Sequence, residues 1–113
     1  MDYNLEERTA KFSEEIISLC KRVPKNVVTL PVTGQLLRCA TSIGANYMEA
    51  NGASSKKDFR NKIAICLKEA RETKYWLRLL AKTDENFAEE CRTFWKEAHE
   101  FTLIFGKICK TSQ

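Results

Sequence analysis

The sequence predicts an all-α protein, an up-and-down antiparallel four-helix bundle formed by a single domain over residues 1–113. Four segments carry apolar residues at intervals of three and four, the spacing of one face of an α-helix. The connections between them are mostly short, and a composition of 43% hydrophobic and 30% charged residues suits a folded globular chain. Four amphipathic helices bury their apolar faces most simply against one another, which gives this bundle.

The first helix is predicted over residues 4–22, where Leu5, Phe12 and Ile16 lie on one face. Pro24 is expected to end it, because proline breaks the hydrogen bonding of a helix interior. Residues 24–32 contain two prolines and a β-branched run. This stretch therefore predicts an extended connection, since a strand there would have no partner elsewhere in the chain.

The second helix is predicted over residues 33–51, with Thr33 as its N-cap and Gly52 closing it in a left-handed conformation. The third is predicted over residues 56–82, after Ser55, a cap residue followed three positions later by an acid. Without proline or glycine, this helix would span about 40 Å at 1.5 Å per residue. Asp84 is expected to open the fourth helix, over residues 84–110.

Several protein classes are disfavoured by the composition. The apolar runs are far shorter than the roughly 20 residues that span a bilayer, and no export signal is visible, so a cytoplasmic protein is expected. Five cysteines without a Cys-x-x-Cys pair predict reduced thiols. Most lie in apolar surroundings and are expected to act as small core residues, with a metal or redox role as the alternative. They are Cys20, Cys39, Cys66, Cys91 and Cys109.

Positive charge is concentrated in the third predicted helix. Residues 56–82 contain nine Lys and Arg against three Asp and Glu, whereas residues 84–110 contain four against six. Most of these cations and one tyrosine fall on one face of a helical wheel, here called the basic stripe: Lys57, Arg60, Lys68, Arg71, Tyr75, Arg78 and Lys82. Such a face suits phosphates along a nucleic-acid backbone. The alternative is a solvated face, with some cations paired to acids of the first or fourth helix in the same or a neighbouring chain.

The second predicted helix has a polar line, consisting of Arg38, Ser42, Asn46 and Glu49 at intervals of three and four. These four side chains share one face. On a short helix of a small bundle, we expect this face to be either solvated or buried against another subunit, where its polar groups would need partners.

No pattern typical of catalysis or of a cofactor is present. A di-metal bundle uses Glu-x-x-His, but the single histidine, His99, has Lys96 three residues before it. His99 is expected at the surface or at the boundary of the core. Phosphate loops and His-Glu-x-x-His are missing from the sequence. The sequence therefore predicts no enzyme, no metal, no cofactor and no small-molecule substrate; a site assembled between subunits is the alternative.

Residues 35–50, the Ser-Lys-Lys-Asp-Phe run at 55–59 and the Leu-Lys-Glu-Ala-Arg-Glu-Thr run at 67–73 closely resemble a bacterial four-helix-bundle family. This family is named for proteins encoded in intervening sequences of 23S rRNA genes, also called S23 ribosomal proteins. The resemblance extends from about Leu30 to Leu80. Matching positions are Arg38, Ala40, Ser42, Ile43, Asn46 and Glu49, whereas Cys39, Tyr47 and the glycine at Gly52 depart from the family pattern.

The resemblance implies an up-down bundle that assembles into a ring-like homo-oligomer, a pentamer, with no known catalytic activity. A distant relation to the accessory bundle protein of diversity-generating retroelements, which partners a reverse transcriptase and nucleic acid, favours RNA or DNA as a ligand. The first hypothesis is therefore an RNA-binding homo-oligomer that uses the basic stripe. The second is a protein-protein scaffold in which the polar line and the cations pair between subunits.

Overall fold

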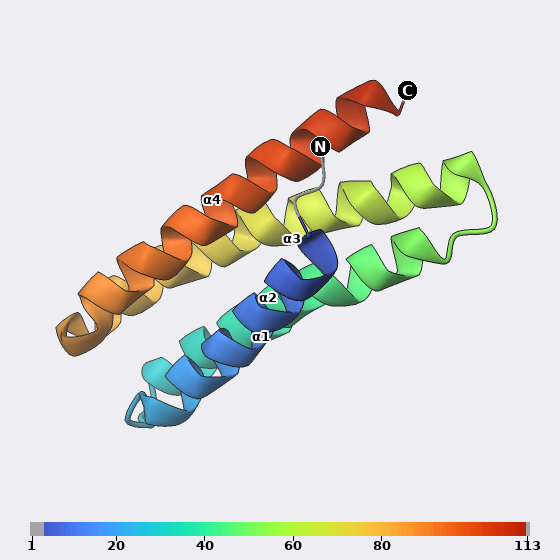
Figure 1. The fold of residues 1–113 in the computed structure, drawn as a ribbon. Helices are drawn as coiled ribbons and strands as arrows, with labels where there is room; N and C mark the ends of the chain where they lie inside the picture. Colours follow the sequence, from blue (N-terminus) through green and yellow to red (C-terminus); the bar gives the residue numbers. More distant parts are fainter. Residues whose placement is uncertain (1–3, 113) are drawn as a thin grey trace.

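The computed structural model describes residues 4–112, and within them it contains four α-helices and no strand (Figure 1). They are α1 (Leu5–Arg22), α2 (Thr29–Asn51), α3 (Lys56–Thr83) and α4 (Ala88–Thr111), with a short 3-10 helix, η1 (Glu85–Phe87), before α4. Consecutive helices run antiparallel, in a body of 44 × 21 × 20 Å. The predicted all-α four-helix bundle is confirmed.

Aromatic side chains fill the centre of the bundle. Phe12 of α1 packs edge-on against Phe94 and Phe101 of α4, with ring centroids 6.0 and 5.4 Å apart. Tyr47 of α2 meets Phe105 of α4 at 5.9 Å. Because these rings reach across the bundle, all four helices contribute to one continuous core.

The four helices do not pack equally closely. α3 lies along both α2 and α4, whereas the backbones of α1 and α4 approach each other at few points (Figure 1). Long side chains span that wider gap, including Arg8, which forms an ion pair with Glu97 at 2.7 Å. α1 and α2 are close because Gly44 has no side chain: a Cβ there would lie 3.1 Å from Thr9 Oγ1. α3 is thus the helix with two well-packed neighbours and one outer face.

The predicted start of the second helix at Thr33 is wrong, since α2 begins at Thr29. Asn26 accepts hydrogen bonds from the N–H groups of Val28 and Thr29 through its side chain, and its own N–H donates to Thr29 Oγ1. Pro31 then falls in the first helical turn, where a missing N–H costs nothing because those groups have no partner within the helix. The residues expected to be extended therefore include the beginning of the helix.

The other predicted helix ends differ less. Ser55 caps α3 as predicted, because its Oγ accepts from the Asp58 N–H at 3.0 Å. Gly52 closes α2 but is not left-handed: its φ is −99°, and its N–H still donates to the carbonyls of Met48 and Glu49 in a right-handed turn. Asp84 caps η1 rather than α4, which begins at Ala88.

The five thiols are free, as expected. Cys39, Cys66 and Cys91 are buried, whereas Cys20 and Cys109 are partly buried against the core. Burial raises the pKa of Cys66 to about 12 and those of Cys20 and Cys91 to about 11. These cysteines are therefore protonated at neutral pH and pack as small apolar residues.

Within residues 4–112, every helix is too short or too polar to cross a bilayer.

Candidate nucleic-acid interface

The basic stripe follows the outer face of α3 from its first turn to its last. The exposed members are Lys57, Lys68, Arg71, Tyr75, Arg78 and Lys82, and Arg60 is half-buried. On the apolar face of the same helix, Leu77 and Leu80 are fully buried. This division follows from the helical period, which separates the two sets by more than a quarter of a turn. The structure thus agrees with the helical wheel that these residues lie on the exposed side of α3.

The cations of the basic stripe have no acidic partner within residues 4–112, where every ion pair involves other basic residues. Arg60 makes one contact, donating from Nη1 to the Ser112 carbonyl at 3.3 Å. The two acids in the middle of α3, Glu69 and Glu72, instead pair with Arg38 of α2. Among the described residues, the stripe is therefore not paired with acids of the first or fourth helix in the same chain, which was one part of the alternative raised by the sequence.

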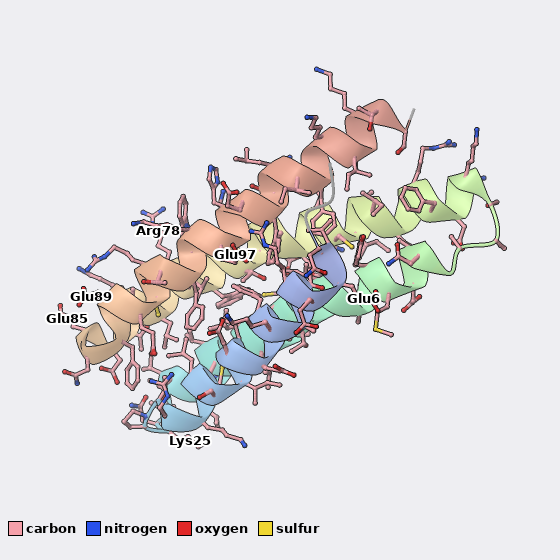
Figure 2. The ribbon with its side chains drawn as sticks, in the orientation of Figure 1. Glu6, Lys25, Arg78, Glu85, Glu89 and Glu97 are labelled. Atoms are coloured by element: carbon pink, nitrogen blue, oxygen red, sulfur yellow. The ribbon has the colours of Figure 1, made fainter. Side chains whose placement is uncertain are left out.

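Three arginines of the stripe lie along the edge of α3 next to α4. Arg60 bonds to Ser112 after the last turn of α4. Arg71 is close enough to Cys109 to lower the pKa of that thiol, although burial raises it more. Arg78 faces Arg92 and Trp95 near the other end of α4. Figure 2 shows Arg78 on the far side of α4 from α1, whereas Glu97 lies between α4 and α1.

A hollow of about 310 Å³ lies between α3 and α4 beside Arg78. It is lined by Leu77, Arg78, Ala81, Cys91, Arg92 and Trp95. A second hollow of about 730 Å³ adjoins it toward η1 and shares Arg78, Ala81 and Arg92, adding Leu79, Lys82, Glu85 and Ala88. Two members of the basic stripe, Arg78 and Lys82, thus form part of a concave surface with side chains of α4.

The wall of the smaller hollow includes Trp95, whose indole has two neighbours. Lys74 Nζ lies 4.8 Å from the centroid of the Trp95 ring, and the His99 ring stacks on it with centroids 5.2 Å apart. Lys74 Nζ and His99 Nδ1 are themselves 3.0 Å apart. His99 is half-buried at the boundary of the core, as predicted.

The sequence did not indicate that Trp95, Arg92 or Lys74 belongs to a site. The two α4 residues belong to a segment of net negative charge, and they meet Arg78 and Lys74 only through helix packing. The available signal was the spacing of Arg92, Trp95 and His99 at three and four, which puts them on one helix face.

The polar line on α2 lies at the edge of the α2–α3 contact. Arg38 forms ion pairs with Glu69 at 3.3 Å and Glu72 at 2.6 Å. Ser42 donates to Glu69 Oε2 at 3.0 Å, and the Asn46 amide donates to the Ser42 hydroxyl at 2.9 Å. These five residues, Arg38, Ser42, Asn46, Glu69 and Glu72, are here called the α2–α3 network.

The polar line is partly exposed to solvent, which was one of the two expectations, but its side chains also pair with α3, which the sequence did not predict. Glu49, its last member, pairs with Lys62 of α3 at 2.9 Å. Glu69 is almost fully buried, but the Arg38 side chain keeps half of its surface exposed. α3 packs against the face of α2 on which the polar line lies. The side chains of the line therefore make contacts with α3, while Arg38 and Glu49 also remain partly exposed to solvent.

Within residues 4–112, no cluster of three or more His, Cys, Asp or Glu side chains could hold a metal ion.

The fold and this surface define a small helical bundle with a cationic outer helix. The family described as the 23S rRNA-intervening sequence protein matches residues 1–106, and the chain belongs to this family. A similar solved structure is the crystal structure of a protein of unknown function from the S23 ribosomal protein family of Bacteroides thetaiotaomicron. It is 35% identical, with a TM-score of 0.83, and the match covers 94% of this chain and 98% of that chain. No curated protein matches the chain.

Proposed function

We propose that this protein is a non-catalytic, homo-oligomeric RNA-binding module of the cytoplasm that binds the RNA backbone through the basic stripe. The observation that carries the proposal is the row of cations along α3 without acidic partners in residues 4–112. Cations that are already paired give little to a new ligand, whereas free ones bind phosphates and release counterions. The stripe extends over about 38 Å from Lys57 to Lys82, at 1.5 Å per residue.

Membership of the 23S rRNA-intervening sequence protein family is compatible with an RNA ligand, but the family name describes where such proteins are encoded. The physical support comes from the distribution of charge. Glu69 and Glu72 of α3 pair with Arg38 of α2, and Glu97 and Glu90 of α4 pair with α1. The outer face of α3 therefore presents positive charge to a polyanion with little competition from the chain itself.

The proposal is tested by reversing charge at the centre of the stripe. We expect the wild-type protein to bind a structured RNA with micromolar affinity at low salt, and log K to fall with log salt with a slope of about −3 if four phosphates are contacted. The double variant Lys68→Glu with Arg71→Glu should bind at least about tenfold more weakly and show a shallower slope. Fluorescence anisotropy of a labelled RNA measures both quantities.

A matched control is the double variant Lys11→Glu with Lys21→Glu, which changes the net charge equally at two exposed positions of α1. It should bind RNA with nearly wild-type affinity, because α1 lies away from the stripe. Equal weakening by both double variants would mean that only net charge matters. No weakening by the stripe variant would exclude the stripe as the binding surface.

A second candidate function, assembly of a protein scaffold, is favoured by exposed apolar side chains on the outer face of α2. Leu30 and Met48 are 56% and 65% exposed, and Leu37 lies between them on the same face. If this face joins subunits, Leu37→Ser with Met48→Ser should shift the protein to a smaller species in analytical ultracentrifugation. An unchanged sedimentation coefficient would count against that interface.

A further inference from the structure

The smaller hollow between α3 and α4 has an apolar interior. Leu77 and Cys91 are buried beneath it, and Ala81 and Trp95 form further parts of its wall. Its volume of about 310 Å³ is at the lower end of the range for small-ligand sites, roughly 300–1,000 Å³. A flat ring system fits such a space, whereas a base-paired helix does not, because the bases of a duplex are stacked inside it.

Trp95 is held in place before any ligand arrives. Its indole contacts Lys74 at 4.8 Å and stacks with His99, and these two side chains are 3.0 Å apart. Trp95 as a whole residue still keeps 37% of its surface exposed. An ordered and partly exposed indole at the wall of an apolar hollow is a stacking platform, because every nucleobase has a face that stacks on an aromatic ring.

Cations border the apolar hollow. Arg78 and Arg92 line it from α3 and α4, and Lys82 lines the adjoining hollow. Glu85 is the acid in the adjoining hollow, on the side toward η1. A ligand with a ring against Trp95 and a phosphate between Arg78 and Arg92 would contact both the apolar interior and the cations at its border. That combination is the chemistry of a nucleotide.

The hollow is continuous with the basic stripe, because Arg78 belongs to both. We infer that the hollow between α3 and α4 takes one unpaired base of an RNA strand whose backbone lies along the stripe, with Trp95 as the stacking surface and Arg78 and Arg92 binding the flanking phosphate. This inference rests on the proposed function and adds to it that the preferred RNA is single-stranded at this point.

The test compares a 12-nucleotide single-stranded RNA with a 12-base-pair RNA duplex, both fluorescently labelled, for the wild type and Trp95→Leu. Since stacking of one base is worth a factor of roughly ten, we expect Trp95→Leu to weaken single-strand binding about tenfold and duplex binding less than about twofold. Trp95→Phe keeps an aromatic ring and should restore most of the affinity. Arg92→Ala should lower the single-strand salt slope by about 0.7.

Thermal unfolding of each variant is measured by circular dichroism, so that a loss of binding is interpreted only for folded protein. If Trp95→Leu is unfolded, Arg92→Ala decides, because Arg92 is exposed and lines the hollow. Weaker single-strand binding by Arg92→Ala, with the shallower salt slope and unchanged duplex binding, would then support the inference. Unchanged single-strand affinity and salt slope in Arg92→Ala would overturn it.

The outcomes separate the inference from the proposed function. If Lys68→Glu with Arg71→Glu weakens RNA binding but Trp95→Leu does not, the stripe binds RNA and the base site is overturned. If Trp95→Leu weakens binding but the stripe variant does not, the stripe is overturned instead. Adenosine monophosphate is the third probe: if it binds the wild type and not Trp95→Leu, while RNA binding is independent of Trp95, the hollow is a free-nucleotide site and the inference fails.

Discussion

The two flanks of α3 differ in whether their charged side chains form ion pairs. Toward α2, the carboxylates of Glu69 and Glu72 are paired with one arginine, Arg38. Toward solvent and α4, the cations of the basic stripe have no acidic partner within residues 4–112. One helix thus has a flank whose charges are satisfied within the chain and a flank whose charges are available to a ligand.

This difference shows that, of the two polar patterns in the sequence, the polar line of α2 stabilises the packing of the helices. Glu69 is nearly buried, so its charge must be compensated, and Arg38 and Ser42 supply the donors. Residues of the family resemblance, such as Arg38 and Ser42, therefore fix how α2 and α3 pack. Within residues 4–112 the stripe cations pair with no acid, so they do not compensate a buried charge as Arg38 does.

The largest effect on folding is expected from breaking the α2–α3 network at Arg38. The substitution Arg38→Ala leaves the Glu69 carboxylate, whose side chain is 8% exposed, with the Ser42 hydroxyl as its remaining side-chain donor in the network. An under-compensated buried charge costs about 2 kcal/mol of unfolding free energy, or roughly 8 °C in Tm for a domain of this size. Urea and thermal denaturation followed by circular dichroism measure both.

Two controls sharpen this comparison. Lys62→Ala removes an ion pair whose carboxylate, on Glu49, is 59% exposed, so it should destabilise the protein much less than Arg38→Ala. Lys68→Glu with Arg71→Glu should change the unfolding free energy by less than about 0.5 kcal/mol, because exposed residues without partners contribute little to stability. Equal losses of stability in all three variants would remove the distinction between the two flanks.

The fold was largely predictable because helical periodicity is local. The apolar spacing of residues such as Phe12 and Ile16 established which faces are buried, and the Ser55 cap established where α3 begins. The start of α2 was missed because Pro31 was interpreted as part of a break. A proline is tolerated in the first helical turn, so its presence does not mark the end of a break. The start of α2 is instead marked by the side chain of Asn26, five residues before Pro31, which accepts from the Thr29 N–H.

The candidate site was predictable only in part. The basic stripe lies on one helix, so a helical wheel was enough to show that its members share the exposed side of α3. The polar line was assigned to solvent or to another subunit, since the sequence alone does not show that α3 packs against that face of α2. Trp95 and Arg92 lie on α4, whereas Arg78 lies on α3. No pattern within either helix predicts that these residues line the same hollow.

The smallest expected effect compares thiols on different sides of the molecule. Cys109 lies beside Arg71, which lowers the pKa that burial raises, whereas Cys39 is fully buried and the pKa of its thiol is raised by burial. Because the thiolate is the nucleophile, Cys109 should react with iodoacetamide on the order of tenfold faster than Cys39, and faster as pH rises toward its pKa. Peptide mass spectrometry resolves the two sites.

In the presence of RNA, the alkylation rate of Cys109 reports whether a phosphate is bound at the neighbouring Arg71. A phosphate on Arg71 offsets the positive charge near Cys109, so the pKa of that thiol should rise and its alkylation at constant pH should slow by about twofold or more. Cys20, which is also partly buried but lies on α1, is the matched control and should react at an unchanged rate. Equal slowing of Cys20 and Cys109 would indicate general stabilisation by RNA, and it would contradict contact at Arg71, because only a local phosphate distinguishes the two thiols.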